Sequence, residues 1–423
     1  MGRHSRPKNR KGLKITGAVL ASTLLLGGAT AGVMYWNLNQ RIQDNAVDIG
    51  VAPELTAQPE IIEETVAEVA EFDGAFNVLL VGNDDGNGDA KYGVREKALN
   101  DVNILLHVSE DHTKATAISV PRDMFVDVPT CTDPETKIKQ TAVRGLKINS
   151  TLSRGGLKCV VDTFRQMTGE TIDYAAMIQF NGVIALSTAV GGVPVCTTSD
   201  INDPESGLKM TAGEHTISGE QALAFLRTRH GVGDGSDLAR ISNQQVFLSS
   251  LMKTLKSKET LSDPKKIYEI ANAAADNMTL STNLANIPTL ASLASSLKNI
   301  PLESITFIQY PTSYLDANGM SGVTPNVAAA EEMIDAVFND KSISLTGGTA
   351  PGSIGAVEQE EPTSPVVTPP AGTTAEDGVT ASPTPTPTVT PSTVPSETPV
   401  ALPSEVTGMT ASQNTCSRGF GDY

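Results

Sequence analysis

The sequence is poor in the residue types that many kinds of functional site require. Its 423 residues include four cysteines, five histidines and one tryptophan, and aromatic residues make up 4%. The cysteines lack the spacing of a metal-binding cluster. The histidines give no support to a Ser-His-Asp or Cys-His catalytic arrangement. No internal repeat is visible. We therefore look for chemistry that depends on other side chains.

Basic residues are also scarce, since 31 Lys and Arg stand against 48 Asp and Glu, for a formal net charge of -17 at pH 7. Nucleic-acid-binding proteins usually carry a basic stripe interleaved with aromatic residues. Neither feature is present here. We therefore expect no nucleic-acid partner.

One long apolar run stands out near the N-terminus. Residues 15–36 carry no charge over 22 positions and follow a segment, 1–14, that holds six Lys or Arg. This length spans a bilayer, and the basic flank is expected to stay in the cytoplasm. Ala29-Thr-Ala31 also fits a signal-peptidase site, but Tyr35 and Trp36 at the end of the run favour an uncleaved anchor. The prediction is a single-pass cell-membrane protein whose remaining chain is extracytoplasmic.

Two further segments have compositions that oppose folding. Residues 37–71 are acidic and are expected to form a stalk outside the membrane. Residues 346–423 are rich in Pro, Thr and Ser and contain twelve of the 25 prolines. Such a composition cannot bury a core, so we predict a disordered tail. The predicted folded domain is therefore residues 72–345.

The cysteines suit an oxidising compartment. Cys131, Cys159 and Cys196 lie in the predicted domain and Cys416 lies in the tail. Four cysteines allow three pairings. Cys416 either staples the tail to the domain or stays free, and the sequence leaves this open.

Arginines are concentrated in one passage, Leu223–Gln245. It contains Arg227, Arg229 and Arg240, followed by Gln244. Guanidinium groups grip phosphates through paired hydrogen bonds. On an acidic background, this passage indicates a phosphate site.

Local signals predict a helix–loop–helix for this passage. Ser218 and Gln221 have the spacing of a capping box, and the helix after them buries Ala222, Phe225 and Leu226. Arg227 and Arg229 would point about 200° apart on a continuing helix, so the helix must end near Thr228. A second helix begins near Ser236 or Asp237 and puts Arg240 and Gln244 on one face.

Three predicted strands bring a second set of charges to this region. They are Phe76–Val81, Asp101–Val108 and Lys114–Val120, and the last two form a hairpin. The hairpin puts Asp101 and Arg122 at the same sheet edge. Asp84 follows the first strand. Two carboxylates and substrate phosphates are usual ligands of Mg²⁺, so Asp84 and Asp101 are the predicted metal ligands.

These motifs in this order resemble the LytR-CpsA-Psr family over about residues 74–340. The matching segments are VLLVGND at 78–84, SVPRDMFVDVP at 119–129, KINSTLSRGG at 147–156, GGVPVC at 191–196, LKMTAGEHTISGEQALAFLRTRH at 208–230 and GDGSDLARISNQQ at 233–245. Each is weak alone, but their order and spacing are specific.

The resemblance implies a membrane-anchored extracytoplasmic phosphotransferase. Such enzymes move a glycopolymer from a polyprenyl pyrophosphate carrier to peptidoglycan with Mg²⁺, for which Mn²⁺ is an alternative. The implied fold is α/β, with a mixed central sheet flanked by helices in an α-β-α sandwich and an apolar pocket for the prenyl chain. There are two alternatives. One is a hydrolase of the carrier, and the other is a non-catalytic regulator that binds prenyl phosphates.

The resemblance also assigns roles to residues. It implies metal binding by Asp84 and Asp101, and pyrophosphate binding by Arg122, Lys147, Arg227, Arg229, Arg240 and Gln244. The expected catalytic residues are Arg122, Arg227, Arg229 and Asp101. The chain departs from the family at Leu99, where many members carry Arg, and Arg95 or Lys97 are candidates to replace it. Asp85 and Asp89 are alternatives to Asp84.

Several roles remain open on the sequence. Asp101 and Asp123 are both candidates for a general base. His230 stands at a helix end, where a cap or a solvated side chain is the more usual role. An apolar stripe after Gln244 fits either the core or the prenyl pocket, and consists of Phe247, Leu248, Leu251, Met252 and Leu255.

Overall fold

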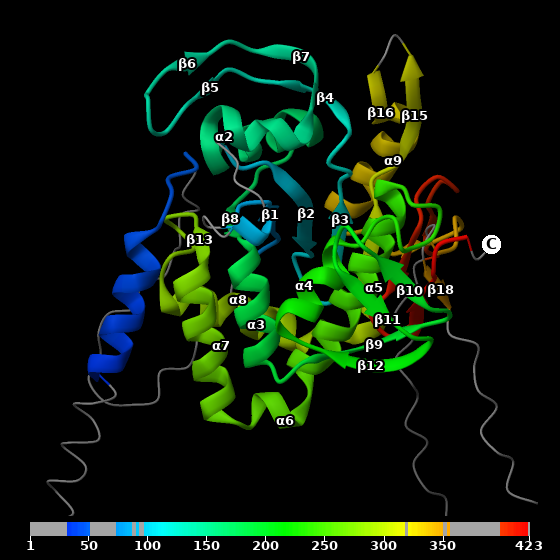
Figure 1. Cartoon of the computed structure of the whole chain (residues 1–423). Helices are drawn as coiled ribbons and strands as arrows, with labels where there is room; N and C mark the ends of the chain where they lie inside the picture. Colours follow the sequence, from blue (N-terminus) through cyan, green and yellow to red (C-terminus); the bar gives the residue numbers. More distant parts are fainter. Residues whose placement is uncertain are drawn as a thin grey trace, which may run out of the picture.

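The computed structural model describes residues 32–50, 73–86, 90–92, 97–317, 320–349, 353–355 and 398–421. Their centre is a mixed seven-stranded sheet (Figure 1). Its strands, in spatial order, are β13 (Met278–Leu280), β8 (Tyr174–Ile178), β1 (Phe76–Asn83), β2 (Asn100–Val108), β3 (Ala115–Ser119), β14 (Ile305–Gln309) and β20 (Gly408–Thr410).

The three strands predicted first in the sequence form the middle of this sheet. β1 and β2 pair antiparallel, and β2 and β3 form the predicted hairpin with Val108 opposite Ala115. β8 joins β1 in parallel, and β14 joins β3 in parallel. Because β2 begins at the edge where β3 ends, Asp101 and Arg122 meet there, as predicted.

Helices cover both faces of the sheet, which confirms the predicted α/β sandwich. Successive strand residues point to opposite faces. Leu79 and Leu105 pack toward α2 (Thr151–Thr168) and α9 (Val327–Phe338). Val78 and Ile104 pack on the other face, which is covered by α5 (Asp237–Lys256), α7 (Pro264–Asn277) and α8 (Ile287–Asn299). This second face carries the site.

A second, four-stranded sheet packs beside α5 and supports the arginine-rich passage. Its order is β12 (Gly213–Ile217), β9 (Val193–Thr197), β21 (Thr415–Ser417) and β18 (Ser353–Gly355). Strands β9 and β12 enclose a separate apolar cluster with α4 (Gly219–Arg227) and α5, and α3 (Phe180–Ala189) packs against α4. This cluster fixes α4 and α5 against each other.

Short elements complete the described chain. The helical ones are η1 (Ala90–Tyr92), η2 (Ile148–Ser150), α6 (Lys258–Leu261) and η3 (Leu302–Ser304). The strands are β4 (Phe125–Val128), β5 (Cys131–Thr132), β6 (Lys139–Gln140), β7 (Val143–Lys147), β10 (Ile201–Asp203), β11 (Leu208–Met210), β15 (Thr312–Ala317), β16 (Met320–Pro325), β17 (Ile343–Ser344) and β19 (Val400–Ala401).

The prediction of a disordered tail over 346–423 is wrong for residues 346–349, for 353–355, which form β18 beside β21, and for 398–421. β20 extends the central sheet beside β14, and β21 enters the second sheet beside β9. Val406 and Met409 are fully buried. A short apolar segment inside a Pro/Thr/Ser-rich stretch is enough to add an edge strand, and the surrounding composition hid it. Residues 356–397 lie outside the described residues.

The cysteines pair as Cys131–Cys159 and Cys196–Cys416. The second disulfide joins β9 to β21 and crosses 220 residues of chain. The sequence left open whether Cys416 links the tail to the domain or stays free. In the structure it links the tail to the domain.

The predicted stalk, 37–71, is corrected for its first part, because residues 37–50 pack on the domain. A helix over residues 32–44 buries Leu38 and Ile42, and its Arg41 pairs with Asp276 of α7 at 2.6 Å. Residues 51–71 lie outside the described residues, as does 15–31, most of the predicted anchor. Within the described ranges, no helix is long and apolar enough to cross a membrane.

Candidate active site

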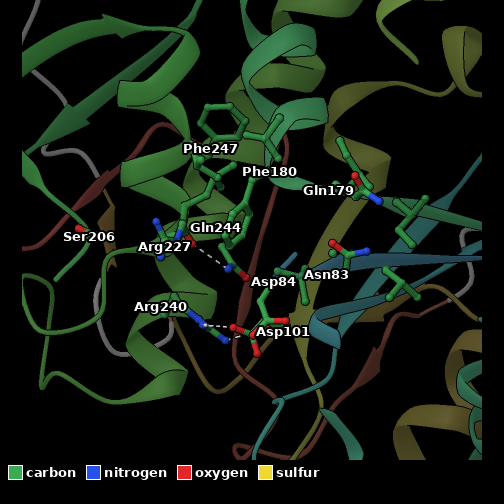
Figure 2. A pocket seen from close by; sticks show the side chains of 18 of the residues that line it. Asn83, Asp84, Asp101, Gln179, Phe180, Ser206, Arg227, Arg240, Gln244 and Phe247 are labelled. Atoms are coloured by element: carbon green, nitrogen blue, oxygen red, sulfur yellow. Dashed lines mark hydrogen bonds and ion pairs between the residues drawn. The ribbon is translucent and has the colours of Figure 1, made fainter. Parts of the chain in front are cut away.

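A cavity of about 460 Å³ lies between the second face of the central sheet and helices α3, α4 and α5. Figure 2 shows Arg227, Arg240 and Gln244 on one side of it, with Asp84 and Asp101 facing them. These five predicted residues, together with Arg122 and Arg229, line the cavity. The structure therefore brings together all the predicted site residues except Lys147.

The turn that separates Arg227 from Arg229 is held by a buried carboxylate. α4 ends at Arg227, and Thr228 has extended backbone, as predicted. Asp203 accepts hydrogen bonds from the Thr228 hydroxyl at 2.7 Å and from the Arg229 amide at 2.9 Å. Burial opposes ionisation of Asp203, but these bonds hold its pKa below the usual value. Asp203 was not predicted, because its position at a strand end is typical of an ordinary turn residue.

The predicted capping box does not form at the start of α4. Ser218 occupies the N-cap position, but its side chain makes no capping hydrogen bond. The Gly219 amide donates instead to the hydroxyl of Ser187 on α3, at 2.9 Å. A tertiary contact therefore satisfies the Gly219 amide, one of the amides that the start of a helix leaves without an intrahelical partner.

The second helix begins as predicted. Ser236 is the N-cap of α5, and its side chain accepts a hydrogen bond from the Ala239 amide. Arg240 and Gln244 follow one turn apart and are both buried. Gln244 donates to the carbonyl of Leu226 at 3.0 Å, which links α5 to the end of α4.

Asp101 organises two arginines at the mouth of the cavity. Its Oδ2 lies 2.7 Å from Nη1 of Arg122 and 3.8 Å from Nη1 of Arg240. Arg240 also donates to the Asp101 carbonyl at 2.9 Å, and its Nη2 lies 2.7 Å from Oδ1 of Asp237. Asp237 also lies 3.8 Å from Nε of Arg122. It was not predicted, because an acidic residue in a first helical turn commonly serves only the helix dipole.

These carboxylates keep Arg122 charged. Burial would lower the pKa of Arg122, but Asp101, Asp237 and Asp123 together raise it. A permanent positive charge at a cavity wall is suited to an anionic ligand.

Asp84 and Asp101 form a pair of carboxylates that fits a hard cation. Asp84 is buried, and its Oδ1 accepts a hydrogen bond from the Leu99 amide at 2.7 Å. Oδ1 of Asp101 is buried and accepts no hydrogen bond within the described part of the chain. Among those same residues no cluster of three His, Cys, Asp or Glu exists. Further oxygen ligands of a bound cation would therefore come from water or a substrate phosphate.

Arg227 is clamped by aromatic rings that the sequence analysis did not select. Its guanidinium carbon lies 4.6 Å from the ring centre of Phe180 and 5.4 Å from that of Tyr92. The Tyr92 hydroxyl donates to Glu220 at 2.6 Å. Burial lowers the pKa of Arg227, although Tyr92, Asp101 and Asp84 act in the opposite direction. Cation–π contacts with two rings restrict the orientation of the guanidinium.

Lys147 lies apart from this cavity. Its ammonium group binds Oδ1 of Asp123 at 2.8 Å, and both residues line a second cavity of about 450 Å³. Burial would raise the pKa of Asp123, but the Lys147 hydrogen bond and the charge of Arg122 lower it below the usual range. Arg122 and Arg229 line both cavities and form the wall between them.

The remaining predicted alternatives are placed as follows. Asp85 does not line the cavity, and Asp89 and Arg95 lie outside the described residues. Lys97 pairs with Asp133 at 2.6 Å and so does not replace the family arginine at Leu99. His230 lines the cavity but pairs with Glu205 at 3.2 Å and is half exposed.

Below the charged mouth, the cavity becomes apolar. Of the stripe after Gln244, Phe247, Leu248 and Leu251 line it, while Met252 and Leu255 pack in apolar clusters. The stripe therefore belongs in part to the cavity and in part to the core, so each of the two predicted alternatives is confirmed in part. The other apolar side chains that line the cavity are Leu80, Val81, Val102, Ile104, Ala176, Ile178, Phe180, Val183, Leu186, Leu223, Leu226 and Met278.

Comparison with known proteins identifies the family of the chain. A model of the LytR_cpsA_psr family matches residues 37–339. The cell wall biosynthesis protein LcpA of Corynebacterium glutamicum is 30% identical over 59% of this chain and 52% of its own length. The chain thus spans about half the length of that relative. The polyisoprenyl-teichoic acid–peptidoglycan teichoic acid transferase TagT of Bacillus subtilis is 25% identical over 73% of this chain and 89% of its own length.

Solved structures agree on the fold. The crystal structure of Bacillus subtilis TagV superposes with a TM-score of 0.50 at 22% identity, over 63% of this chain and 97% of that one. A protein of Streptococcus agalactiae superposes with the same score at 24% identity, over 63% of this chain and 88% of that one. With the family match covering most of its length, the chain belongs to the LytR_cpsA_psr family.

Proposed function

We propose that this protein is a phosphotransferase that moves a glycopolymer from a polyprenyl pyrophosphate carrier to peptidoglycan. The observation that carries the proposal is the composition of the main cavity. One part of the lining is formed by Arg122, Arg227, Arg229 and Arg240, and most of the lining surface of the cavity is apolar. A ligand that fits both parts has an anionic head and a hydrocarbon chain, as a prenyl pyrophosphate has. TagT, one of the relatives, is named for transfer from such a polyisoprenyl carrier.

The reaction requires charge stabilisation more than covalent chemistry. An acceptor hydroxyl oxygen bonds to the phosphorus that carries the glycan, the pyrophosphate P–O bond breaks, and prenyl phosphate leaves. The hydroxyl proton passes to a carboxylate or to solvent. Negative charge grows on the leaving oxygen, and preorganised guanidinium groups stabilise it. Arg122 and Arg240 are held for this purpose by Asp101 before substrate binds.

We propose Mg²⁺ as the cofactor, with Asp84 and Asp101 as its protein ligands and Mn²⁺ as an alternative. When bound, the cation would neutralise pyrophosphate charge. Two carboxylates completed by phosphate oxygens and water are a common way to hold Mg²⁺. The buried Oδ1 of Asp101, which accepts no hydrogen bond within the described ranges, is available for this role.

We propose that the protein acts outside the cell membrane, to which residues 15–36 anchor it. Two disulfides support an oxidising compartment. A membrane-embedded carrier would then reach the cavity from the membrane surface, while the acceptor comes from the wall side.

The test is transfer of a radiolabelled glycan phosphate from a polyprenyl carrier to peptidoglycan by the full chain in detergent. We expect label on peptidoglycan with Mg²⁺ and none with EDTA. Metal-dependent release of prenyl phosphate without labelled peptidoglycan would instead identify a carrier hydrolase. Tight carrier binding without any turnover would identify a non-catalytic regulator.

A further inference from the structure

The second cavity is walled on one side by the two arginines of the main site and on the other by an exposed hairpin. Arg122 and Arg229 form the first wall. The hairpin β15–β16 contributes Tyr314, Ser321 and Gly322 to the second. In Figure 1 this hairpin stands out from the body of the molecule.

The hairpin is fixed on the turn between β3 and β4, which carries Arg122. The Val323 amide donates to the Asp123 carbonyl at 3.2 Å, and Val323 forms a bridge with Met124. Gly322 packs so closely that a Cβ atom there would lie 2.5 Å from the Asp123 carbonyl oxygen. The distance between the hairpin and Arg122 is therefore set by backbone contacts.

The groups that face this cavity suit a sugar. Lys147 and Asp123 offer a donor and an acceptor, joined at 2.8 Å, and Ser321 adds a hydroxyl. Tyr314 also lines it, although its side chain is 68% exposed. An exposed ring beside hydrogen-bonding groups provides a flat apolar platform with polar groups at its edge.

We propose that this second cavity is the acceptor subsite, in which Tyr314 and Asp123 hold the hydroxyl-bearing sugar of the peptidoglycan. The inference rests on the proposed function. In phosphoryl transfer, the attacking and leaving oxygens lie roughly in line with phosphorus. The leaving prenyl phosphate occupies the main cavity, so the attacking hydroxyl must come from the other side of the arginines that bind the phosphates. The second cavity lies on that side of Arg122 and Arg229.

Asp123 would contact the acceptor hydroxyl. Its carboxylate is ionised and lies beside Arg122, with Nε of Arg122 3.5 Å from Oδ2. An acceptor hydroxyl bound in this cavity would donate to that carboxylate, which directs the oxygen toward the phosphorus held by Arg122. Tyr314 determines which acceptors bind, because it touches only the sugar.

The experiment is two-substrate kinetics on the full chain, with lipid-linked glycan and soluble peptidoglycan strands varied independently. Tyr314→Ala is expected to raise the KM of the acceptor roughly fivefold to tenfold, with the KM of the carrier unchanged. Tyr314→Phe keeps the ring and should restore the acceptor KM. Tyr268→Ala is the matched control, because Tyr268 is an exposed tyrosine of α7 that lines neither cavity.

Other results would overturn the assignment. A rise in the carrier KM alone would place the donor's own glycan in the second cavity, and no change in either KM would exclude a sugar there. If the wild-type chain transfers nothing, the proposed function fails, and calorimetric binding of a muramic-acid-containing disaccharide still tests the subsite. Binding by wild type that is weakened in Tyr314→Ala but not in Tyr268→Ala would uphold the subsite, and equal or absent binding would reject it.

Discussion

Nη1 of Arg122 lies 2.7 Å from Oδ2 of Asp101, and this ion pair joins the end of one strand region to the start of the neighbouring strand. Arg240 approaches the same carboxylate from α5. Asp101 thus holds two like charges side by side that would otherwise repel each other. The arginines are consequently oriented before an anionic ligand arrives.

Replacement of Arg122 should remove transition-state stabilisation. We expect Arg122→Ala to lower kcat about 10²- to 10³-fold, because a preorganised charge at the reacting phosphate is lost. Arg122→Lys should recover only part of this, since an ammonium group lacks the paired donors of guanidinium. Release of prenyl phosphate in a single-turnover assay measures the effect. Arg144→Ala, an exposed arginine of β7, is the control, and an equal loss there would argue against a specific role for Arg122.

Removal of the Asp84 carboxylate should weaken metal binding more than removal of the Asp85 carboxylate. Asp84→Asn keeps an acceptor for the Leu99 amide but removes a charge from the proposed cation site. We expect the Mg²⁺ concentration for half-maximal activity to rise about tenfold or more, by analogy with the loss of other metal contacts. Asp85→Asn, next in the chain but not in the cavity lining, should change it little. The same Mg²⁺ titration for both variants would contradict the assignment.

The apolar part of the cavity should discriminate between prenyl chains. Leu248 lines it from α5 and is only partly buried, so Leu248→Trp adds a large ring within the volume. We expect a several-fold rise in KM for a long polyprenyl carrier and a smaller rise for a farnesyl carrier, which needs less of the cavity. Competition between the two carriers measures the ratio. An equal rise for both would place the chain elsewhere.

Asp203 should make the stability of the arginine-bearing turn dependent on pH. Its hydrogen bonds from Thr228 and Arg229 lower its folded pKa below the unfolded value of about 3.9. A lowered pKa contributes stability above the unfolded pKa, and this contribution is lost as the pH falls through the folded one. Asp203→Asn should therefore cost about 1–2 kcal/mol at pH 7 and less at pH 3, which lies below the unfolded pKa.

Urea unfolding of the wild type and of Asp203→Asn at both pH values measures this difference. A cost that is the same at pH 7 and pH 3 would show that the charge of Asp203 has no part in holding the turn.

The two disulfides should contribute unequally to stability. Cys196–Cys416 closes 220 residues and Cys131–Cys159 closes 28, so the unfolded chain is constrained more by the first. We expect Cys196→Ser/Cys416→Ser to lower the free energy of unfolding by about 1–2 kcal/mol more than Cys131→Ser/Cys159→Ser. Thermal unfolding of both double variants, each in oxidising buffer, gives the comparison.

The longer disulfide should also affect activity at temperatures where the protein stays folded. The C-terminal backbone beyond Cys416 bonds to the loop after His230, through Gly233 to Arg418 at 3.0 Å and Phe420 to Gly231 at 3.1 Å. Loss of the staple should release this loop and lower kcat several-fold. Unchanged kcat in Cys196→Ser/Cys416→Ser would show that the loop holds its shape without the C-terminal segment.

Local patterns in the sequence determined the parts of the site that depend on neighbours along the chain. Short apolar runs located β1, β2 and β3, and the short turn between β2 and β3 set the pairing that joins Asp101 to Arg122. The spacing of Arg227 and Arg229 required a helix end at Thr228, and Ser236 marked the next helix. These features follow from the periods of helix and strand and from caps within a few residues.

The tertiary structure alone decided the contacts between distant segments. It pairs Cys416 with Cys196, brings Ser187 to the start of α4 in place of the capping box, and stacks Phe180 on Arg227. It also places Lys147, which was predicted to bind pyrophosphate with the arginines, in the second cavity. Partners this far apart in the chain are chosen by how whole helices and sheets pack, and no local period records that choice.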